Sequence, residues 1–317
     1  MKTIISIAMN PSIDKSSSVE RVIAERKLYC GKPRYEPGGG GVNVSRAIKK
    51  LGGESKLLYP QGGLSGQLLN NLLEEEGISH QAFPIKGAVR ENLIILEAST
   101  GYQFRFGMPG PELHENEWRK CLDEVARIKP KADYIVASGS LPDGVPSDFY
   151  ARIARLGKEI GAKVIVDAPS HTFKLVLQEG VYLIKPNIRE FRELVGDEIK
   201  EESQIKTRAK AIVESKESEI VIISLGAGGA IIATKDTVEH ILPPTVPVIS
   251  KVGAGDSMVA GIVLALARGM SVPEAARFGV AAGAAAVMTA GTELCRREDT
   301  ERLYKEMVSE VSKAKAD

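Results

Sequence analysis

The sequence predicts an α/β fold: a doubly wound, mostly parallel β-sheet with helices on both faces. The first observation is that short β-branched runs alternate with amphipathic helical segments through most of the 317 residues, the order expected of repeated β-α-β units. The second is that polar or glycine-rich stretches repeatedly follow the expected strands, where sheets of this class bind their ligands. A hydrophobic content of 43% allows a sizeable core, so we expect a single domain spanning residues 1–317.

The elements follow from the spacing of apolar residues. The first helix, Val42–Leu51, is expected to turn Val42, Ala47 and Leu51 to the core and Arg46, Lys49 and Lys50 to solvent. A run of small apolar residues from Met258 predicts a buried helix. The other predicted strands are Ile4–Met9, Tyr134–Ala137, Lys163–Asp167, Tyr182–Lys185 and Glu219–Leu225, and the other predicted helices are Ser65–Glu76, Ser147–Ile160, Ile188–Val195 and Thr207–Ser215.

Two segments, Ser16–Pro37 and Val89–Met108, interrupt this order with strand-like alternation, as in Leu93–Glu97 and Gln103–Phe106. We expect two insertions, at about residues 15–37 and 88–109, to form a small β-sheet lid over the strand ends. A sheet of this size is not stable alone, so it should pack on the main domain, on a ligand or on a partner subunit.

Charge and cysteine usage exclude several classes of protein. The net charge of +1, from 42 basic and 41 acidic residues, gives no electrostatic case for nucleic acid or a membrane surface as partner. The three cysteines show neither disulfide nor zinc spacing, which fits a reducing cytoplasm. The charge-free run Phe278–Thr292 is too short to span a bilayer.

A glycine turn before the helix at Met258 is the first candidate site. Gly253 and Gly255 let the backbone turn sharply and present its N–H groups at a helix N-terminus, which attracts anions. Asp256 would repel such an anion unless it has a chemical role, for example taking a proton from a hydroxyl group that attacks a phosphate. The alternative is an Asp that only caps the helix.

A second glycine run, Gly38–Gly41, precedes another helix and a polar side chain, Asn43. A ligand could approach this backbone closely, and Asn43 could bind a sugar hydroxyl; the alternative is a hinge. Asp14 follows the first strand, where its carboxylate could accept hydrogen bonds from a sugar or simply cap a turn. Lys27, Arg90 and Arg105 on the expected lid could bind phosphate, although each is also an ordinary solvated charge.

Two further stretches follow expected strands. Asn187 and Glu190 are three residues apart on one helix face, a spacing that suits a hydrated Mg²⁺ held through one carboxylate or, alternatively, a capping box. The glycine turn Ser224–Gly229 could admit a nucleotide phosphate, although such turns are common.

Together these motifs resemble the ribokinase-like sugar kinases of the pfkB family. Gly38–Ala47, with Gly52, is similar to the first family signature, and Val252–Ser257, with Gly261, is similar to the second. The resemblance runs from Met1 to about Tyr304. The phosphosugar kinases within the family are the best match, on Asn10–Asp14, Arg90–Asn92 and Ser138–Pro142 among other stretches.

The resemblance implies a ribokinase-like fold and the ATP- and Mg²⁺-dependent phosphorylation of fructose 6-phosphate at O1, giving the fructose 1,6-bisphosphate of glycolysis. It implies that Asp256 is the base and that the amides of Gly253, Ala254 and Gly255 form the anion hole. The sugar phosphate would be bound by Asp14, Lys27, Gly39, Asn43, Arg90, Arg105 and Ser138. The nucleotide would be bound by Lys185, Asn187, Ser224, Gly226 and Gly229, with Glu190 organising Mg²⁺.

The resemblance further implies a homodimer through the lid and a loop that binds a monovalent cation such as K⁺ near Ser250, Val252, Ala286 and Gly291. Glu293 lies near that loop, where a neutral or basic residue is expected. Three alternatives stay open for function: tagatose 6-phosphate as acceptor, fructose 1-phosphate as acceptor, and a non-catalytic sugar-phosphate sensor. A nucleoside acceptor is disfavoured because it has no use for basic residues on the lid.

Overall fold

A computed structural model describes residues 2–196, 199 and 201–314, with side chains described to residue 310. In this part of the chain the main sheet has nine strands and is parallel except for β12 and β13, which extend it as an antiparallel hairpin at one edge. The strands in spatial order are β13 (Val238–Ile241), β12 (Ala230–Ala233), β11 (Ser218–Ser224), β10 (Val181–Ile184), β9 (Lys163–Asp167), β8 (Tyr134–Ser138), β1 (Ile4–Ile7), β4 (Lys56–Gln61) and β5 (His80–Pro84).

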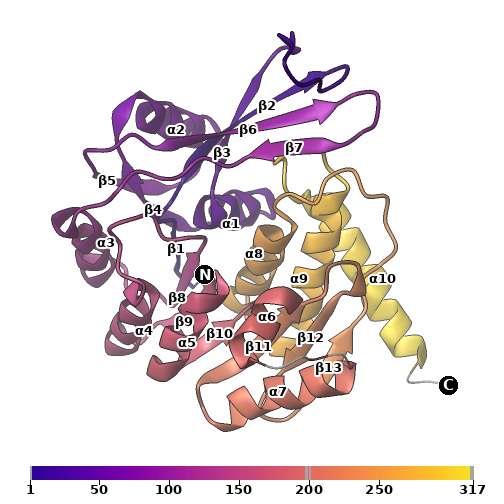
Figure 1. Cartoon of the computed structure of the whole chain (residues 1–317). Coiled ribbons are helices and arrows are strands. Elements are labelled where there is room, and N and C mark those ends of the chain that lie inside the picture. The colour runs from indigo at the N-terminus through magenta and orange to yellow at the C-terminus, as the bar shows by residue number, and fades with distance from the viewer. Residues whose placement is uncertain (1, 197–198, 200, 315–317) are drawn as a thin grey trace.

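Helices cover both faces of this sheet (Figure 1). Alternate strand residues enter two different apolar clusters, as in β8, where Tyr134 and Val136 join one and Ile135 and Ala137 the other. The first cluster is completed by α1 (Gly40–Lys50), α8 (Ala254–Ala267), α9 (Val272–Val287) and α10 (Arg297–Ala314). The second is completed by α3 (Glu115–Arg127), α4 (Phe149–Ile160), α5 (Ser170–Glu179), α6 (Ile188–Val195) and α7 (Glu202–Glu214). The predicted doubly wound fold is confirmed.

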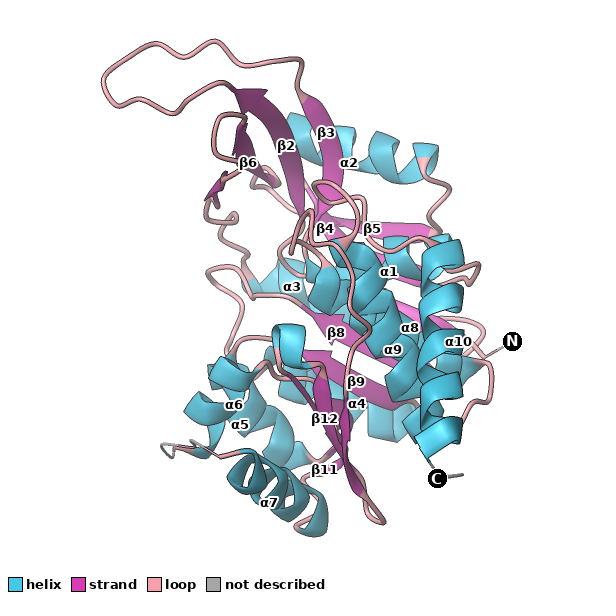
Figure 2. Ribbon diagram, turned by 90° about the vertical axis from the view of Figure 1, so that its right-hand side faces the viewer, coloured by secondary structure: helices cyan, strands magenta, loops and turns pink. Residues whose placement is uncertain are grey.

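The predicted small sheet is also present, in the order β3 (Arg34–Gly38), β2 (Ser12–Val19), β6 (Arg90–Glu97) and β7 (Gln103–Phe106). It lies at one end of the molecule (Figure 2). Its inner side packs with α2 (Gly63–Glu75) on a third apolar cluster that includes Ile13, Val42 and Tyr59. Two predictions are not tested by the fold: that two insertions form this sheet as a lid, and that residues 1–317 are a single kinase domain.

Several boundaries differ from the prediction. Strand β2 begins at Ser12, and residues 20–33 form a long loop between β2 and β3 that extends away from the core (Figure 2). Helix α8 begins at Ala254, before Met258, because Gly253 caps it with a left-handed φ of 73°. Helix α7 begins at Glu202 rather than Thr207, since Glu201 and Gln204 form a capping box.

The orientation predicted for Arg46 is wrong. Its side chain is 2% exposed rather than solvated, because its guanidinium N–H groups are satisfied inside the protein by Glu76 and by the carbonyls of Pro37 and Thr292. Lys49, by contrast, is exposed as expected. Among the helices of the described residues, none has the length and hydropathy that crossing a bilayer requires.

Candidate active site

The two glycine runs lie together at the carboxyl edge of the main sheet. Helix α1 starts directly against the ends of β1 and β8: a Cβ on Gly41 would lie 2.3 Å from the carbonyl oxygen of Ile7, and one on Gly40 would lie 2.6 Å from Ser138 Oγ. Only glycine permits this approach. As a result, the α1 N-terminus, with Gly39 at the N-cap position, opens beside Ser138.

A hydrogen bond joins this turn to the second one. Asn43 Nδ2 donates to Asp256 Oδ2 at 2.9 Å, and Asp256 lies in the first turn of α8 just after the amides of Gly253, Ala254 and Gly255. A Cβ on Gly253 would lie 2.3 Å from Leu294 Cδ2, so the Leu294 side chain packs directly against this turn. The predicted anion hole, the predicted base and a predicted sugar ligand therefore form one site.

The environment of Asp256 makes its carboxylate more basic than usual. Burial, followed by the nearby charge of Asp167, raises the pKa of Asp256 to about 6, while the Asn43 hydrogen bond and the Lys185 charge oppose this. A carboxyl group with a pKa near 6 is ionised at pH 7 and still accepts a proton readily, which is what a general base needs.

Asp167 is a residue that the sequence analysis did not assign to the site. It ends β9, and its Oδ1 pairs with Lys185 Nζ at 3.0 Å. Lys185 is 4% exposed, and its Nζ lies 3.7 Å from where a Cβ on Gly255 would be. Burial raises the pKa of Asp167, and Lys185 opposes this. The sequence feature that could have identified Asp167 is a carboxylate at the end of a predicted strand.

On the predicted sugar side, some polar groups have hydrogen-bond partners within the protein and others have none. Asp14 is 7% exposed and accepts hydrogen bonds from Ser12 Oγ and Asn92 Nδ2, both at 2.8 Å. Arg90 donates to the carbonyls of Asn10 and Met108 at 3.1 and 3.2 Å, and burial lowers its pKa.

Three of the predicted sugar-binding residues each have a buried atom with no hydrogen-bond partner among the described residues: Arg90 Nε, Asn43 Oδ1 and Ser138 Oγ. Buried polar groups are normally satisfied. A ligand that carries hydroxyl groups and a negative charge would satisfy all three.

Lys27 and Arg105 are not brought to this site by any contact within the described residues. Lys27 is exposed on the 20–33 loop, with its Nζ 5.2 Å from the ring centroid of Tyr29. Arg105 is exposed on β7, at the outer edge of the small sheet. Their predicted contact with a substrate phosphate stays a prediction and requires a partner subunit or a movement of the small sheet.

The predicted nucleotide residues lie on neighbouring strand ends. Ser224 bridges to Asn187 and its N–H donates to the carbonyl of Pro186 at 3.0 Å, so the stretch after Lys185 runs beside the glycine turn Gly226–Gly229. Apart from Gly226 and its chain neighbours, no atom of the described residues lies within 4 Å of where a Cβ on Gly226 would be, whereas a Cβ on Gly229 would lie 2.1 Å from the Ile241 carbonyl oxygen. The turn is therefore open at Gly226 and packed at Gly229.

Asn187 and Glu190 form the capping box that was the alternative interpretation: Asn187 Oδ1 accepts from the Glu190 N–H and Glu190 Oε2 accepts from the Asn187 N–H, at 2.9 and 2.8 Å. The cap occupies one oxygen of Glu190. Burial, followed by Asp167, raises the pKa of Glu190, so a cation would stabilise its ionised form. Among the described residues, no three acidic, His or Cys side chains are grouped to hold a metal.

The four residues of the predicted cation loop also lie together. Ser250 Oγ donates to the Gly291 carbonyl and accepts from the Val252 N–H, both at 3.2 Å, and the Ser250 N–H donates to the Val287 carbonyl. The Ala286 carbonyl, next to Val287, accepts from Thr289 Oγ1. Glu293 forms an ion pair with Arg296 at 2.8 Å.

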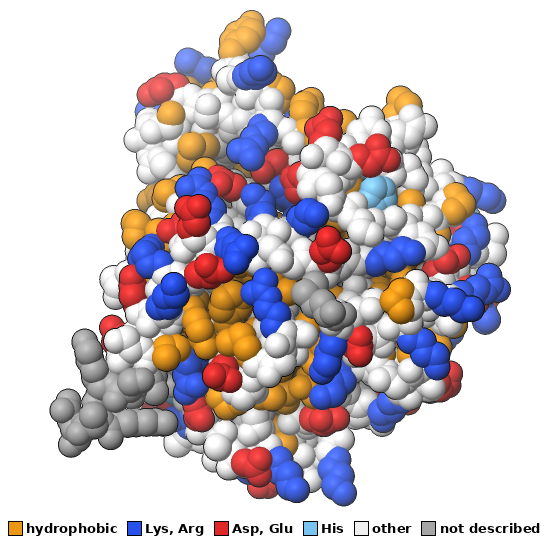
Figure 3. Space-filling view, turned by 180° about the vertical axis from the view of Figure 1, so that it is seen from behind, with side chains coloured by type: hydrophobic (Ala, Val, Ile, Leu, Met, Phe, Trp, Pro, Cys, Tyr) orange, Lys and Arg blue, Asp and Glu red, His pale blue; other side chains and the backbone are white. Residues whose placement is uncertain are grey.

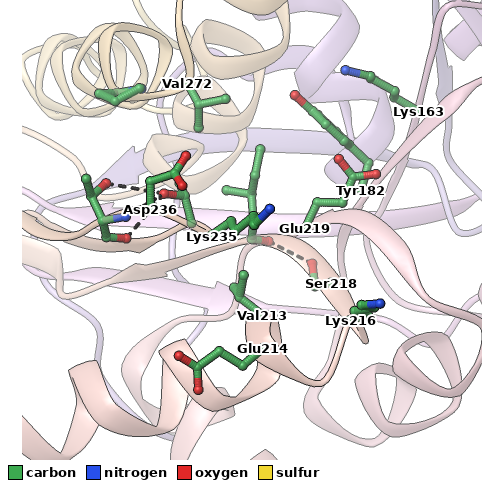
Figure 4. Close-up of a pocket in the computed structure, with 14 residues that line it drawn as sticks. Lys163, Tyr182, Val213, Glu214, Lys216, Ser218, Glu219, Lys235, Asp236 and Val272 are labelled. Carbon is green, nitrogen blue, oxygen red and sulfur yellow. Dashed lines mark hydrogen bonds between the residues drawn. The ribbon is translucent and has the colours of Figure 1, made fainter.

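A separate cavity of about 830 Å³ lies at the opposite edge of the sheet, where β9, β10 and β11 begin. Figure 4 shows Val272 on one side of it and Val213 with Glu214 on the other. Its charged residues are three lysines and three acids, namely Lys163, Lys216, Lys235, Glu214, Glu219 and Asp236. In the view from behind, a group of hydrophobic side chains is likewise bordered by both signs of charge (Figure 3). No predicted site residue lines this cavity.

Comparison with known sequences places these features in a family context. A profile described as pfkB family carbohydrate kinase matches residues 3–299. The chain is 40% identical over 301 residues to ATP-dependent 6-phosphofructokinase isozyme 2 of Mycobacterium tuberculosis H37Rv, covering 95% of this chain and 88% of that one. It is 38% identical over 305 residues to the protein of that name from Escherichia coli K12, covering 96% and 98%. It is 30% identical over 308 residues to the 1-phosphofructokinase of Bacillus subtilis 168, covering 97% and 98%.

Solved structures agree. Phosphofructokinase-2 from Escherichia coli in complex with potassium superposes with a TM-score of 0.94 at 37% identity, over 97% of this chain and all of that one. Its complex with fructose 6-phosphate gives a TM-score of 0.92 at 36% identity over the same shares. A ribokinase from Thermotoga maritima, at 20% identity and a TM-score of 0.74 over 96% of this chain, shares the fold.

The raised pKa of Asp256 predicts a stability effect. Below about pH 3 the carboxyl is neutral in both the folded and the unfolded chain, but above pH 6 the folded chain must hold it ionised in a partly buried position. We expect Asp256→Asn to increase the free energy of unfolding by about 1–3 kcal/mol at pH 8 and not to change it at about pH 3. Urea unfolding at the two pH values measures this. Equal stability of mutant and wild type at pH 8 would refute the raised pKa.

Proposed function

Because the chain belongs to the pfkB family of carbohydrate kinases, we propose that it transfers the γ-phosphoryl group of ATP to O1 of fructose 6-phosphate. The observation that carries this proposal is the placement of a basic carboxylate, Asp256, in an anion-binding turn. A half-buried arginine, Arg90, has a buried Nε without a hydrogen-bond partner on the sugar side of the same site. A kinase that acts on a phosphorylated sugar needs both features.

The reaction depends on positioning more than on covalent chemistry. Asp14, Gly39 and Asn43 hold the sugar, and Arg90 and Ser138 bind its phosphate. Asp256 then accepts the proton of the O1 hydroxyl as O1 attacks the γ-phosphorus. The amides of Gly253, Ala254 and Gly255 stabilise the negative charge on the transferring group. Lys185, next to Gly255, contributes positive charge from below the turn and is itself held by Asp167.

ATP lies across the strand ends that carry Lys185, Asn187, Ser224, Gly226 and Gly229. The residues fit Mg²⁺: one oxygen of Glu190 is left free by the cap, and a single carboxylate with water and phosphate oxygens suits that ion. When bound, Mg²⁺ would neutralise phosphate charge. If Glu190→Gln and other Glu190 variants leave the Mg²⁺ requirement of the reaction unchanged, that result would argue against Glu190 as the residue that organises the ion.

Three further features of the protein are part of the proposal. The Ser250–Gly291 region binds K⁺, which the potassium complex of the Escherichia coli relative supports. The small sheet forms a homodimer contact, supported by apolar side chains that it and its connections leave exposed: Ile23, Tyr29, Tyr35, Leu96, Tyr102, Phe106 and Met108. A cytoplasmic location is supported by three free cysteines. Comparing the activity in K⁺ with that in Na⁺ tests the cation site, and sedimentation tests the homodimer.

The second candidate is a kinase for fructose 1-phosphate, favoured by the 30% identity to the Bacillus subtilis protein. Tagatose 6-phosphate is the third possible acceptor, because the site residues do not distinguish it from fructose 6-phosphate. A sensor without catalysis would have no need for Asp256 in the anion-binding turn.

Substrate preference is the first test of the function. We expect kcat/KM with Mg-ATP to be more than about tenfold higher for fructose 6-phosphate than for fructose 1-phosphate or ribose, which is roughly 1.4 kcal/mol in the transition state. A coupled assay with tagatose 6-phosphate as a fourth acceptor measures it. A preference for fructose 1-phosphate would overturn the proposal in favour of the second candidate, and no turnover of any acceptor would favour the sensor.

Arg90 provides a test of phosphate recognition. We expect Arg90→Ala to raise KM for fructose 6-phosphate by about tenfold or more, since a charge-assisted contact is lost, and to change KM for ATP by less than about twofold. Arg119→Ala removes an exposed arginine that pairs with Glu115 and lies over the Trp118 ring, and serves as control. Equal changes in both KM values would show that Arg90 supports the site structurally instead.

The pKa of Asp256 predicts the pH dependence of the reaction. Since the base must be ionised, kcat/KM should fall about tenfold for each pH unit below 6. Asp167→Asn removes the charge that helps to raise this pKa and frees Lys185 to lower it, so the acid limb of the pH profile should move to lower pH.

Asp256→Asn should reduce kcat by about 10²–10⁴ with little change in either KM.

The matched control for this shift is Glu115→Gln, which removes a carboxylate on the exposed face of α3. It should leave the acid limb in place. If Asp167→Asn also leaves the limb in place, the limb belongs to another group and the assignment of Asp256 as base fails.

A further inference from the structure

Arg46 is the buried arginine whose orientation the helix pattern did not predict, and its contacts reach beyond its own helix. It lies three residues after Asn43 on α1. Nε and Nη2 pair with the two oxygens of Glu76 at 2.7 and 2.6 Å. Nη1 donates to the carbonyl of Pro37 at 2.9 Å and to that of Thr292 at 3.1 Å. One planar group thus connects three segments that are far apart in the sequence.

The first of these segments is the root of the small sheet. Pro37 is the residue before Gly38–Gly41, the predicted sugar-binding turn. Its neighbour Glu36 is 4% exposed, with Oε1 3.0 Å from Arg34 and 3.8 Å from Arg46. In the β2–β3 register Glu36 lies opposite Asp14. Arg46 therefore fixes the strand through which the small sheet meets the sugar side of the site.

The second segment lies below the phosphoryl turn. Thr292 belongs to the loop between α9 and α10, whose Gly291 carbonyl accepts from Ser250 Oγ. Leu294 of the same loop occupies the space under Gly253. Thr289 Oγ1 donates to the Leu294 carbonyl at 2.9 Å and so closes the loop on itself. Arg46 thus holds the loop on which the turn Gly253–Gly255 rests.

Charge alone does not account for an arginine here. Burying a guanidinium group costs free energy that an ion pair only partly returns, and a packed apolar side chain would stabilise α1 as well. The fixed geometry of the planar fork is what a lysine or an apolar residue cannot reproduce. A small displacement of reacting groups costs a large factor in rate, so a fixed distance between the two turns has catalytic value.

We propose that Arg46 is a positioning residue that sets the sugar-binding turn, Gly38–Gly41, at the separation from the phosphoryl turn, Gly253–Gly255, that transfer requires. The proposal rests on the proposed phosphotransfer function. Arg46 touches neither substrate. It acts through Pro37 on one turn and through the Thr292–Leu294 stretch on the other, while the Asn43–Asp256 hydrogen bond joins the two turns directly.

The test compares Arg46→Lys with wild type. Lysine keeps the charge and loses the fork, so we expect kcat to fall by about 10²-fold, with each KM changed by less than about threefold. Hydrogen exchange should become faster both in residues 34–39 and in residues 289–295. The matched control is Arg155→Lys, which breaks a pairing of two guanidinium nitrogens with Glu179 on α4 and α5 and should change neither readout.

Glu76→Gln is the second variant, in case Arg46→Lys does not fold. It removes the charge from a partner at the end of α2 whose side chain is 32% exposed, and it should change kcat and exchange in the same direction by smaller amounts. A folded Arg46→Lys protein with wild-type kcat would overturn the proposal, as would faster exchange in only one of the two segments. The exchange readout does not require turnover, so it decides this inference even if the substrate panel refutes the proposed function.

Discussion

The hydrogen bond between Asn43 and Asp256 joins residues that are 213 positions apart, and it forms only because two helices begin at the same place. Helix α1 can start against the ends of β1 and β8 because Gly40 and Gly41 have no side chain to collide with Ser138 and Ile7. Helix α8 can start there because Gly253 turns the chain with a positive φ. Any larger residue at Gly41 would push α1 away from the sheet and separate Asn43 from Asp256.

The electrostatics of the site depend on that close packing. Asp167, Glu190 and Asp256 each have a raised pKa with burial as the main cause, and the Asp167 charge adds to the shift of the other two. Lys185 opposes all three shifts. Such an arrangement disfavours the folded state at neutral pH, but it leaves a carboxylate that can accept a proton and a surplus of negative charge that a cation or a nucleotide-bound metal would neutralise. The protein therefore loses folding stability in exchange for side chains with pKa values suited to proton transfer.

The small sheet connects this site to the surface of the molecule. It is too small to be stable alone, and its inner side is held by an apolar cluster and by the contacts of Arg46 with Pro37 and, more distantly, Glu36. Its outer parts leave aromatic and aliphatic side chains exposed. Arg90 stands at the first position of β6, where the sheet meets the core, so a movement of the sheet would move a group that we propose contacts the substrate phosphate.

Local pattern was enough to predict the fold class, the small sheet, both glycine turns and the candidates Asp14, Asn43 and Asp256, because apolar periodicity and glycine runs report directly on helices, strands and sharp turns; Lys185 became a candidate through the family resemblance. It did not show that Asp167 faces Lys185, since that contact joins the ends of two adjacent strands. It also placed Arg46 in solvent, because helical spacing takes a charged side chain as exposed and cannot detect carbonyls and a carboxylate supplied by distant segments. Tertiary structure decided these points: long-range packing alone sets which polar groups find partners, and with them the pKa of Asp256 and the geometry between the two turns.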